Sequence, residues 1–262
     1  MKRLGAWLRT LMADLTVSLL FSTRLPLADS SAIDGRDLAR ASWALPVAGL
    51  GVGAIGAVVY GAMARIGMPS GPAAALALAS AMAITGCLHE DGLADTTDGF
   101  GGGKDREQKL GIMRDSRLGT YGACALLGSL LLRWSALATI ADPRSVAFAL
   151  IASHAAARAP LPSFMRLVPA ARSDGLSAAA GAPSPESAAM AWVIGAAALI
   201  AGLNPAAGVS ALLLLAAATT AMAWATVRQI GGQTGDVVGA LEQVNEVLIL
   251  LIAAAAHNPQ AH

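Results

Sequence analysis

Charged residues are distributed very unevenly along this chain, and their distribution limits the fold more than any other feature. Within residues 41–88 only Arg65 is charged, whereas twelve charges fall within residues 89–117. Charged residues make up only 13% of the sequence and the mean hydropathy is +0.59, whereas about 25% is usual in soluble globular chains. The chain is therefore expected to be an integral membrane protein.

The uncharged stretches predict an all-α fold, a polytopic membrane helix bundle that forms a single domain over residues 1–262. A membrane-spanning helix needs about 20 predominantly apolar residues. About seven such spans are predicted, at residues 42–64, 72–88, 118–140, 145–165, 187–203, 206–227 and 238–256. The fourth and seventh contain prolines or ionisable groups, so either could be broken or partly re-entrant. Gly49 and Gly53 form a GxxxG pair, which favours close helix packing.

The N-terminal segment and the positive charges predict an orientation. Apolar residues recur every three or four positions from Leu4 to Leu19, which indicates an interfacial amphipathic helix; Arg9 and Asp14 argue against a signal peptide. Six Lys or Arg residues precede the first span and five lie within residues 89–117, whereas the opposite connections hold only Arg65 and Arg144. The positive-inside rule then places the charged cluster in the cytoplasm.

Three aspartates follow the predicted second span. If the helix continues, Asp91, Asp95 and Asp98 stand at i, i+4 and i+7 and share one face. Three carboxylates so close together repel one another, and Mg²⁺ is a natural partner because it prefers hard oxygen ligands and is commonly held by a few carboxylates and substrate phosphates. A solvated acidic helix end is the alternative.

Glycines and cations come directly after the aspartates. Glycines 99 and 101–103 would leave backbone N–H groups open to an anion. The cations that follow are Lys104, Arg106, Lys109, Arg114 and Arg117, with Asp115 between the last two. Carboxylates for a metal, glycines for close approach and cations for charge predict a phosphoryl-transfer site in a cytoplasmic acidic and Gly-rich active-site loop. Its predicted phosphate-binding residues are Gly101, Gly102, Gly103, Lys104, Arg114 and Arg117.

Several familiar interpretations of this block fail. A Walker A loop would need Gly at position 98 and Ser or Thr at position 105, where Asp98 and Asp105 stand. The dinucleotide fingerprint fails because Lys104 replaces its last glycine, and a zinc protease motif lacks its second histidine. A net charge of +1 gives no field suited to nucleic acid, so no nucleic-acid partner is expected.

A second polar island stands at the start of the predicted seventh span. Asp236 follows Gly235 and should lie on the same side of the membrane as the acidic cluster. Ionisable groups in or beside membrane spans are costly and are usually functional. For Glu242 and Glu246, structural pairing with Arg158 or Arg133 is an equally serious interpretation.

These residues resemble the cobalamin synthase family, the adenosylcobinamide-GDP ribazoletransferases of bacterial vitamin B12 assembly. The resemblance runs through most of the chain, at residues 23–26, 89–99 with the glycines that follow, 112–122, 171–176 and 232–240. The central block HEDGLADTTDG is highly specific. One departure is Glu90, which stands where many members carry an apolar residue.

The resemblance implies a Mg²⁺-dependent enzyme of the bacterial inner membrane that joins adenosylcobinamide-GDP to α-ribazole or its 5′-phosphate and releases GMP. Asp91, Asp95 and Asp98 are then the expected metal ligands. The ribazole 5′-hydroxyl is expected to attack, and Asp236, or a cluster aspartate such as Asp98, is expected to accept its proton. Residues expected to support these groups or the substrate are His89, Glu90, Asp115, Thr234 and Glu242.

Two rival functions remain. A CDP-alcohol type membrane phosphotransferase also uses clustered aspartates, and an ion-coupled transporter could use Glu242, Glu246 and Arg158. The dense aspartate and glycine block argues against the first, and the lack of internal repeats argues against the second. Membrane lipid is the other expected partner, and self-association is left open.

Overall fold

The computed structural model describes residues 2–25 and 35–257, and in this part of the chain it is built from helices without a β-strand. The all-α prediction is confirmed. The helices are α1 (Lys2–Ser22), α2 (Gly35–Ala41), the 3-10 helix η2 (Ser42–Ala44), α3 (Leu45–Arg65), α4 (Ser70–Thr85), α5 (Leu88–Gly102), α6 (Arg106–Ile112), α7 (Thr120–Ile140), α8 (Pro143–Arg158), α9 (Leu161–Leu167), α10 (Leu176–Ala180), α11 (Pro185–Gly202), α12 (Pro205–Ile230) and α13 (Gly235–His257).

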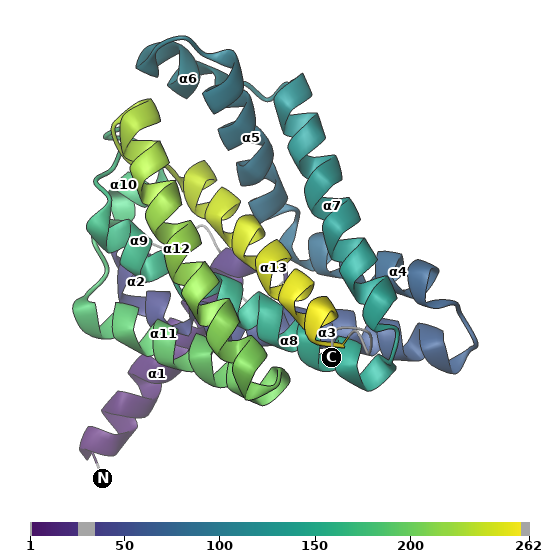
Figure 1. Ribbon diagram of the computed structural model, residues 1–262. Helices are drawn as coiled ribbons and strands as arrows, with labels where there is room; N and C mark the ends of the chain where they lie inside the picture. The colour runs from purple at the N-terminus through teal and green to yellow at the C-terminus, as the bar shows by residue number, and fades with distance from the viewer. Residues whose placement is uncertain (1, 26–34, 258–262) are drawn as a thin grey trace.

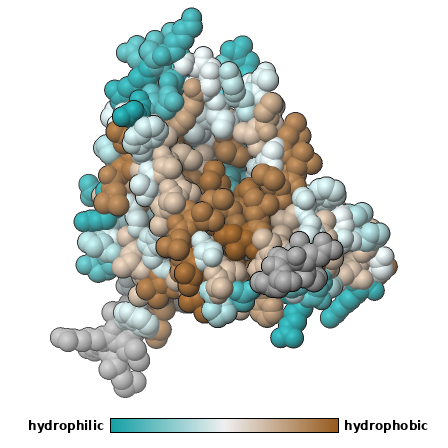
Figure 2. All heavy atoms as spheres, viewed as in Figure 1, coloured by the Kyte–Doolittle hydropathy of each residue, from teal (hydrophilic) through white to brown (hydrophobic). Residues whose placement is uncertain are grey.

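Among the described residues, five helical segments are long and apolar enough to cross a membrane, which makes the chain a membrane protein. They are Gly35–Arg65, Thr120–Ile140, Pro185–Gly202, Pro205–Ile230 and Gly235–His257. A sixth span results if α4 and α5, which meet at a bend of 88°, count as one. Figure 2 shows apolar side chains over the middle of the molecule. The prediction of seven spans is not confirmed.

The predicted fourth span is the clearest difference. Helix α8 has only 16 residues and ends at Arg158, and α9 begins at Leu161 with a proline in its first turn. Proline lacks the N–H that a continuing helix needs, so the run of residues 145–165 is divided into two helices. Most of the second half of α8 is buried inside the protein. Its polar side chains can therefore be matched by protein groups instead of lipid.

Helices α3 and α8 cross at the predicted GxxxG pair. A Cβ atom at Gly49 would overlap the carbonyl oxygen of His154, and one at Gly53 would stand 2.5 Å from that of Leu150. Only glycine permits this approach of two backbones, so the predicted packing role of Gly49 and Gly53 is confirmed.

The polar connections gather at two ends of the bundle (Figure 1). At the α6 end, which comprises α6 and the loops 113–119, 168–175 and 231–234, Arg106 donates to the carbonyl oxygens of Ile230 and Ala171 at 2.8 and 2.5 Å. At the other end, the hydroxyl of Tyr60 donates to the carbonyl oxygen of Ala141 at 3.0 Å. The structure therefore brings the predicted cationic connections after α5, α9 and α12 together.

The predicted N-terminal helix forms as α1. Its buried Asp14 accepts hydrogen bonds from Arg40 Nε at 2.8 Å and Trp43 Nε1 at 3.0 Å. Trp7 and Met12 are exposed on its outer half. The position of α1 on a membrane interface stays a prediction.

Candidate active site

The acidic and glycine-rich block is a helix, α5, and the prediction of an active-site loop is wrong for this segment. Gly86 ends α4 in the left-handed conformation, and α5 starts at Leu88 after the bend. Gly101 and Gly102 lie within α5, and the N–H of Gly103 donates to the carbonyl oxygen of Gly99 at 3.2 Å. These glycines therefore do not form the open anion cradle that the sequence suggested.

The glycine run instead permits close packing. A Cβ at Gly101 would stand 2.7 Å from the ring of Tyr121, and one at Gly103 would stand 2.5 Å from Lys109 Cγ. At about 1.5 Å per residue, Gly103 and the exposed Lys104 lie about 18 Å along the helix axis from Asp91. The structure does not bring the run 101–104 to the first aspartate of the block.

Asp98 has a structural role at the start of α7. Its side chain is buried, and its two carboxylate oxygens accept hydrogen bonds from the N–H groups of Gly119 at 2.7 Å and Gly122 at 2.8 Å. These are the N–H groups that a helix start leaves without intrahelical partners. In this structure Asp98 is therefore a capping residue of α7.

Asp91, Asp95 and Asp236 lie on α5 and α13 near the point where the two helices cross. A Cβ at Gly92 would stand 2.6 Å from the carbonyl oxygen of Asp236, so glycine is required for the crossing. The charges of Asp91, Asp236 and Asp98 all act on the half-buried Asp95. The structure thus places Asp236 of the second polar island beside the acidic helix, whereas the sequence predicted only that both lie on the same side of the membrane.

Two side chains from neighbouring loops hold the carboxylate of Asp236 in place. The hydroxyl of Thr234 donates to Asp236 Oδ2 at 3.1 Å, and Arg172 Nη2 lies 3.5 Å from the same oxygen. Sequence reasoning noted the segment 171–176 without giving Arg172 a role. The only sequence signal for Arg172 was its position two residues before Asp174, in a segment that resembles the family.

The loops that carry Thr234 and Arg172 are joined by backbone hydrogen bonds. Gln233 N–H donates to the carbonyl oxygen of Pro169 at 2.7 Å, and Ala171 N–H donates to that of Gln233 at 2.8 Å. A Cβ at Gly232 would overlap the carbonyl oxygen of Pro169. The glycine therefore allows the parallel contact that fixes Arg172 beside Asp236.

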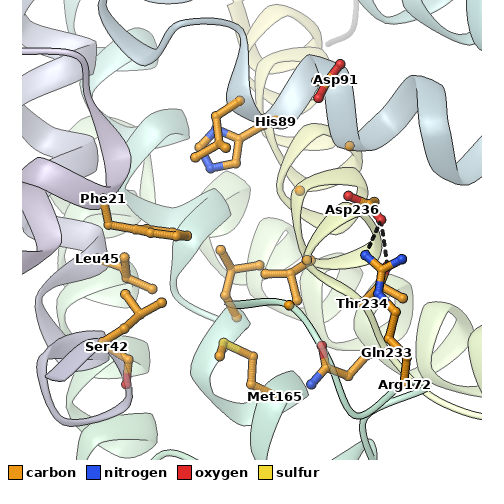
Figure 3. Close-up of a pocket in the computed structure, with 18 of the residues that line it drawn as sticks. Phe21, Ser42, Leu45, His89, Asp91, Met165, Arg172, Gln233, Thr234 and Asp236 are labelled. Atoms are coloured by element: carbon orange, nitrogen blue, oxygen red, sulfur yellow. Dashed lines mark hydrogen bonds and ion pairs between the residues drawn. The ribbon is translucent and has the colours of Figure 1, made fainter. Parts of the chain in front are cut away.

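Two hollows open on either side of Asp91. The inner cavity, of about 240 Å³, lies between α1, α3, α5, α9 and α13 and contains Asp236 and Arg172 (Figure 3). The outer groove, of about 650 Å³, lies between α5 and α7 and is bordered by Asp95 and the loop 113–119. Asp91 borders both, so a group held at Asp91 can be reached from either side.

Arg114 and Arg117 lie on the loop 113–119, which is not helical, and both are paired with aspartates. Arg114 Nη2 contacts both oxygens of Asp174 at 2.8 and 2.7 Å. Arg117 Nε donates to both oxygens of Asp115 at 3.0 Å. This guanidinium holds the pKa of Asp115 below its ordinary value. Both arginines are exposed, so they remain able to reach a ligand in the groove.

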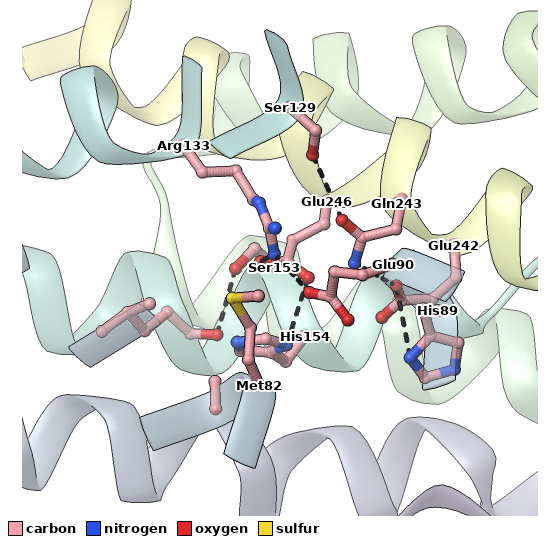
Figure 4. Close-up of polar contacts among 12 residues, drawn as sticks. Met82, His89, Glu90, Ser129, Arg133, Ser153, His154, Glu242, Gln243 and Glu246 are labelled. Carbon is pink, nitrogen blue, oxygen red and sulfur yellow. Dashed lines mark hydrogen bonds and ion pairs between the residues drawn. The ribbon is translucent and has the colours of Figure 1, made fainter. Parts of the chain in front are cut away.

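A buried ionic network lies beneath the acidic helix (Figure 4). Arg158 contacts Glu242 at 2.7 Å, and Arg133 contacts Glu246 and Glu90, each at 3.2 Å. The structural pairing of Glu242 and Glu246 is confirmed. Glu242 is 0% exposed and contacts Arg158, so any support that it gives to the site acts through neighbouring side chains.

Two histidines complete this network. His154 Nδ1 lies 3.4 Å from Glu246, and His89 Nδ1 lies 3.6 Å from Glu242. Among the described residues, the one set of three side chains whose ligand atoms lie within 4.8 Å of one another is His154, Glu242 and Glu246. The aspartates of α5 do not form such a preassembled set.

The fold and the site define a class first: an all-helical, polytopic membrane protein with clustered carboxylates and arginines at one end of its bundle. The profile of the cobalamin-5-phosphate synthase family matches residues 14–254. The chain belongs to this family.

Curated relatives agree with the family match. A protein of Bradyrhizobium diazoefficiens is 55% identical and one of Mesorhizobium japonicum is 54% identical, each over 95% of both chains. A relative from Azorhizobium caulinodans is 43% identical over 92% of this chain and 95% of its own. All three are named adenosylcobinamide-GDP ribazoletransferase. No solved structure matches the chain.

Proposed function

We propose that this protein is an adenosylcobinamide-GDP ribazoletransferase, which joins adenosylcobinamide-GDP to α-ribazole or its 5′-phosphate and releases GMP in cobalamin synthesis. Relatives with this name share more than half of the residues over nearly the whole chain. The observation that carries the proposal is the position of Asp91, Asp95 and Asp236 between two hollows. A transferase must bring its two substrates together at one place, and Asp91 borders both hollows.

Mg²⁺ fits the exposed Asp91 and the half-buried Asp95. Their oxygens are hard donors, and repulsion from the neighbouring carboxylates would be relieved by a cation. Mg²⁺ commonly uses only one or two protein carboxylates together with waters and substrate phosphates, so a preassembled set of three ligands is not required. When bound, Mg²⁺ would neutralise charge on the diphosphate. Asp98 is not part of this proposed metal site, because its carboxylate caps α7.

The side chains around Asp91 suit an in-line displacement. A ribose hydroxyl attacks the phosphorus bonded to cobinamide, a new O–P bond forms, and the P–O bond to GMP breaks. Asp236 accepts the hydroxyl proton, while Thr234 and Arg172 hold its carboxylate in place. Arg114 and Arg117 border the groove where they can stabilise the departing phosphate.

The activity itself is tested by GMP release. Membranes containing the protein, supplied with adenosylcobinamide-GDP, α-ribazole and Mg²⁺, are expected to form GMP and adenosylcobalamin in equal amounts. The same membranes carrying Asp236→Asn are the matched control, in which release should fall at least about a hundredfold because the proton acceptor is lost. Absence of GMP release by the unaltered protein would refute the proposed function, and a CDP-alcohol phosphotransferase or a transporter would give this result.

A phosphate clamp at Arg117 predicts a specific response to lysine. Arg117→Lys should lower kcat/KM for adenosylcobinamide-GDP at least about tenfold, nearly as much as Arg117→Ala, because lysine cannot present two coplanar donors to phosphate. Arg144→Lys, at the other end of the molecule, should leave the rate unchanged. A rate for Arg117→Lys within about twofold of the unaltered protein would restrict Arg117 to its pair with Asp115.

The α6 end is proposed to face the cytoplasm of a bacterium, with the bundle in the inner membrane. Six Lys and Arg residues lie there within residues 103–119 and 168–175, against Arg65 and Arg144 in the opposite connections, in agreement with the positive-inside rule. In a variant without the exposed Cys87 and Cys124, cysteines at positions 111 and 173 should react only from the cytoplasmic side. Cysteines at positions 66 and 257 should react only from the other side. Labelling of positions 111 and 257 from one side would contradict this topology.

A further inference from the structure

The inner cavity and the outer groove differ in size, and this difference indicates which substrate each of them can hold. Cavities for drug-sized ligands range over about 300–1,000 Å³. The inner cavity, at about 240 Å³, lies just below that range, whereas the groove, at about 650 Å³, is well within it. A nucleoside is small enough for the inner cavity. A corrinoid that carries GDP is larger than either hollow, so we expect only its diphosphate end to enter, through the larger outer groove.

The inner cavity has an apolar wall on one side. Phe21, Leu45, Leu161 and Met165 line it from α1, α3 and α9. In Figure 3 the ring of Phe21 projects into the cavity opposite Asp236. Aromatic rings stack on one another and bury flat apolar surface, so this wall suits a planar base with few polar edges. The amino group of a purine placed against these side chains would lose its hydrogen bonds to water.

The opposite side of the cavity is polar. Gln233, Thr234 and Arg172 line it from the two loops that backbone hydrogen bonds join, and Asp236 lines it from the first turn of α13. These side chains offer both donors and acceptors, as the hydroxyl groups of a sugar require. A ligand with an apolar aromatic half and a hydroxylated half matches the two walls, with its sugar beside Asp236.

From this match, and resting on the proposed function, we propose that the inner cavity is the binding site of the benzimidazole nucleoside. Phe21 and Met165 contact the base and determine which bases are accepted. The sugar lies between Gln233, Thr234 and Asp236. A hydroxyl group on the sugar ring then points toward Asp91, where the diphosphate of the second substrate arrives from the groove. The 5′-oxygen is not the attacking atom, because the 5′-phosphate form has no free hydroxyl there.

The test separates the two substrates kinetically. In reconstituted liposomes, Phe21→Ala is expected to raise KM for α-ribazole about tenfold or more, with KM for adenosylcobinamide-GDP within about twofold of the unaltered protein. The matched control is Phe148→Ala, a half-exposed phenylalanine of α8 remote from both hollows. It should change neither KM. Phe21→Leu keeps apolar bulk without the ring and serves if the alanine variant does not fold; an increase of at least about threefold is expected.

A second variant tests the choice of base. Met165→Gln places an amide in the apolar wall. The ratio of kcat/KM for the adenine nucleoside to kcat/KM for α-ribazole should then rise at least about fivefold. If the unaltered protein releases GMP but Phe21→Ala and Phe21→Leu leave KM for α-ribazole within about twofold, the nucleoside does not bind here and the proposed function still stands. An increase in KM for adenosylcobinamide-GDP alone would likewise overturn the assignment.

Discussion

Replacement of Asp91 or Asp95 by asparagine is expected to lower kcat at least about a hundredfold, because each change removes a charged metal ligand without changing the size of the side chain. The Mg²⁺ concentration that gives half-maximal activity should rise in both variants. The measurement is GMP release in liposomes at a series of Mg²⁺ concentrations, with adenosylcobinamide-GDP and α-ribazole in excess.

Asp98→Asn is the matched control for these variants, since it makes the same change on the same helix. Asparagine caps helices about as well as aspartate, although here one of the two accepted hydrogen bonds is lost. We therefore expect a loss of helix stability of about 1 kcal/mol and an unchanged Mg²⁺ requirement. If Asp91→Asn and Asp95→Asn keep nearly normal rates while Asp98→Asn alone requires more Mg²⁺, the proposed metal site is wrong.

The contrast between these aspartates shows how far sequence can predict the site. Helical spacing correctly places Asp91, Asp95 and Asp98 on one helix, because spacing alone decides which residues share a face. The direction of a carboxylate depends on the donors near it. For Asp98 those donors are Gly119 and Gly122 at the start of another helix. That contact depends on tertiary packing, which a spacing argument does not include.

The same distinction applies to the fold. The uneven charge distribution indicates a membrane bundle, which is confirmed. For Glu242 and Glu246 the sequence left function and pairing with Arg158 or Arg133 open, and the structure shows the pairing. The glycine run 101–103 was misinterpreted because glycine serves open loops and close packing alike. Arg172 was missed because its partner, Asp236, is distant in sequence and is brought near only by the contact between loops 168–175 and 231–234.

The buried pair of Arg158 and Glu242 should dominate the stability of the bundle. Both side chains are at most 1% exposed, and their 2.7 Å contact is close to the network that supports α5. Glu242→Leu would leave the Arg158 guanidinium buried without its counter-charge, and removal of one partner of a buried pair typically costs about 3–5 kcal/mol. We expect a large fall in unfolding temperature and poor recovery of folded protein.

Removal of both charges should be much less harmful, because no uncompensated charge remains. Replacement of a buried ion pair by apolar side chains is often close to neutral. The double variant Arg158→Met with Glu242→Leu should therefore recover most of the stability lost in Glu242→Leu alone, as measured by thermal unfolding in lipid nanodiscs. Recovery of stability without recovery of GMP release would mean that the pair also positions His89 and the acidic helix. If Glu242→Leu alone unfolds at the temperature of the unaltered protein, Arg158 has enough other partners, such as the carbonyl oxygen of His154 at 2.7 Å, to do without Glu242.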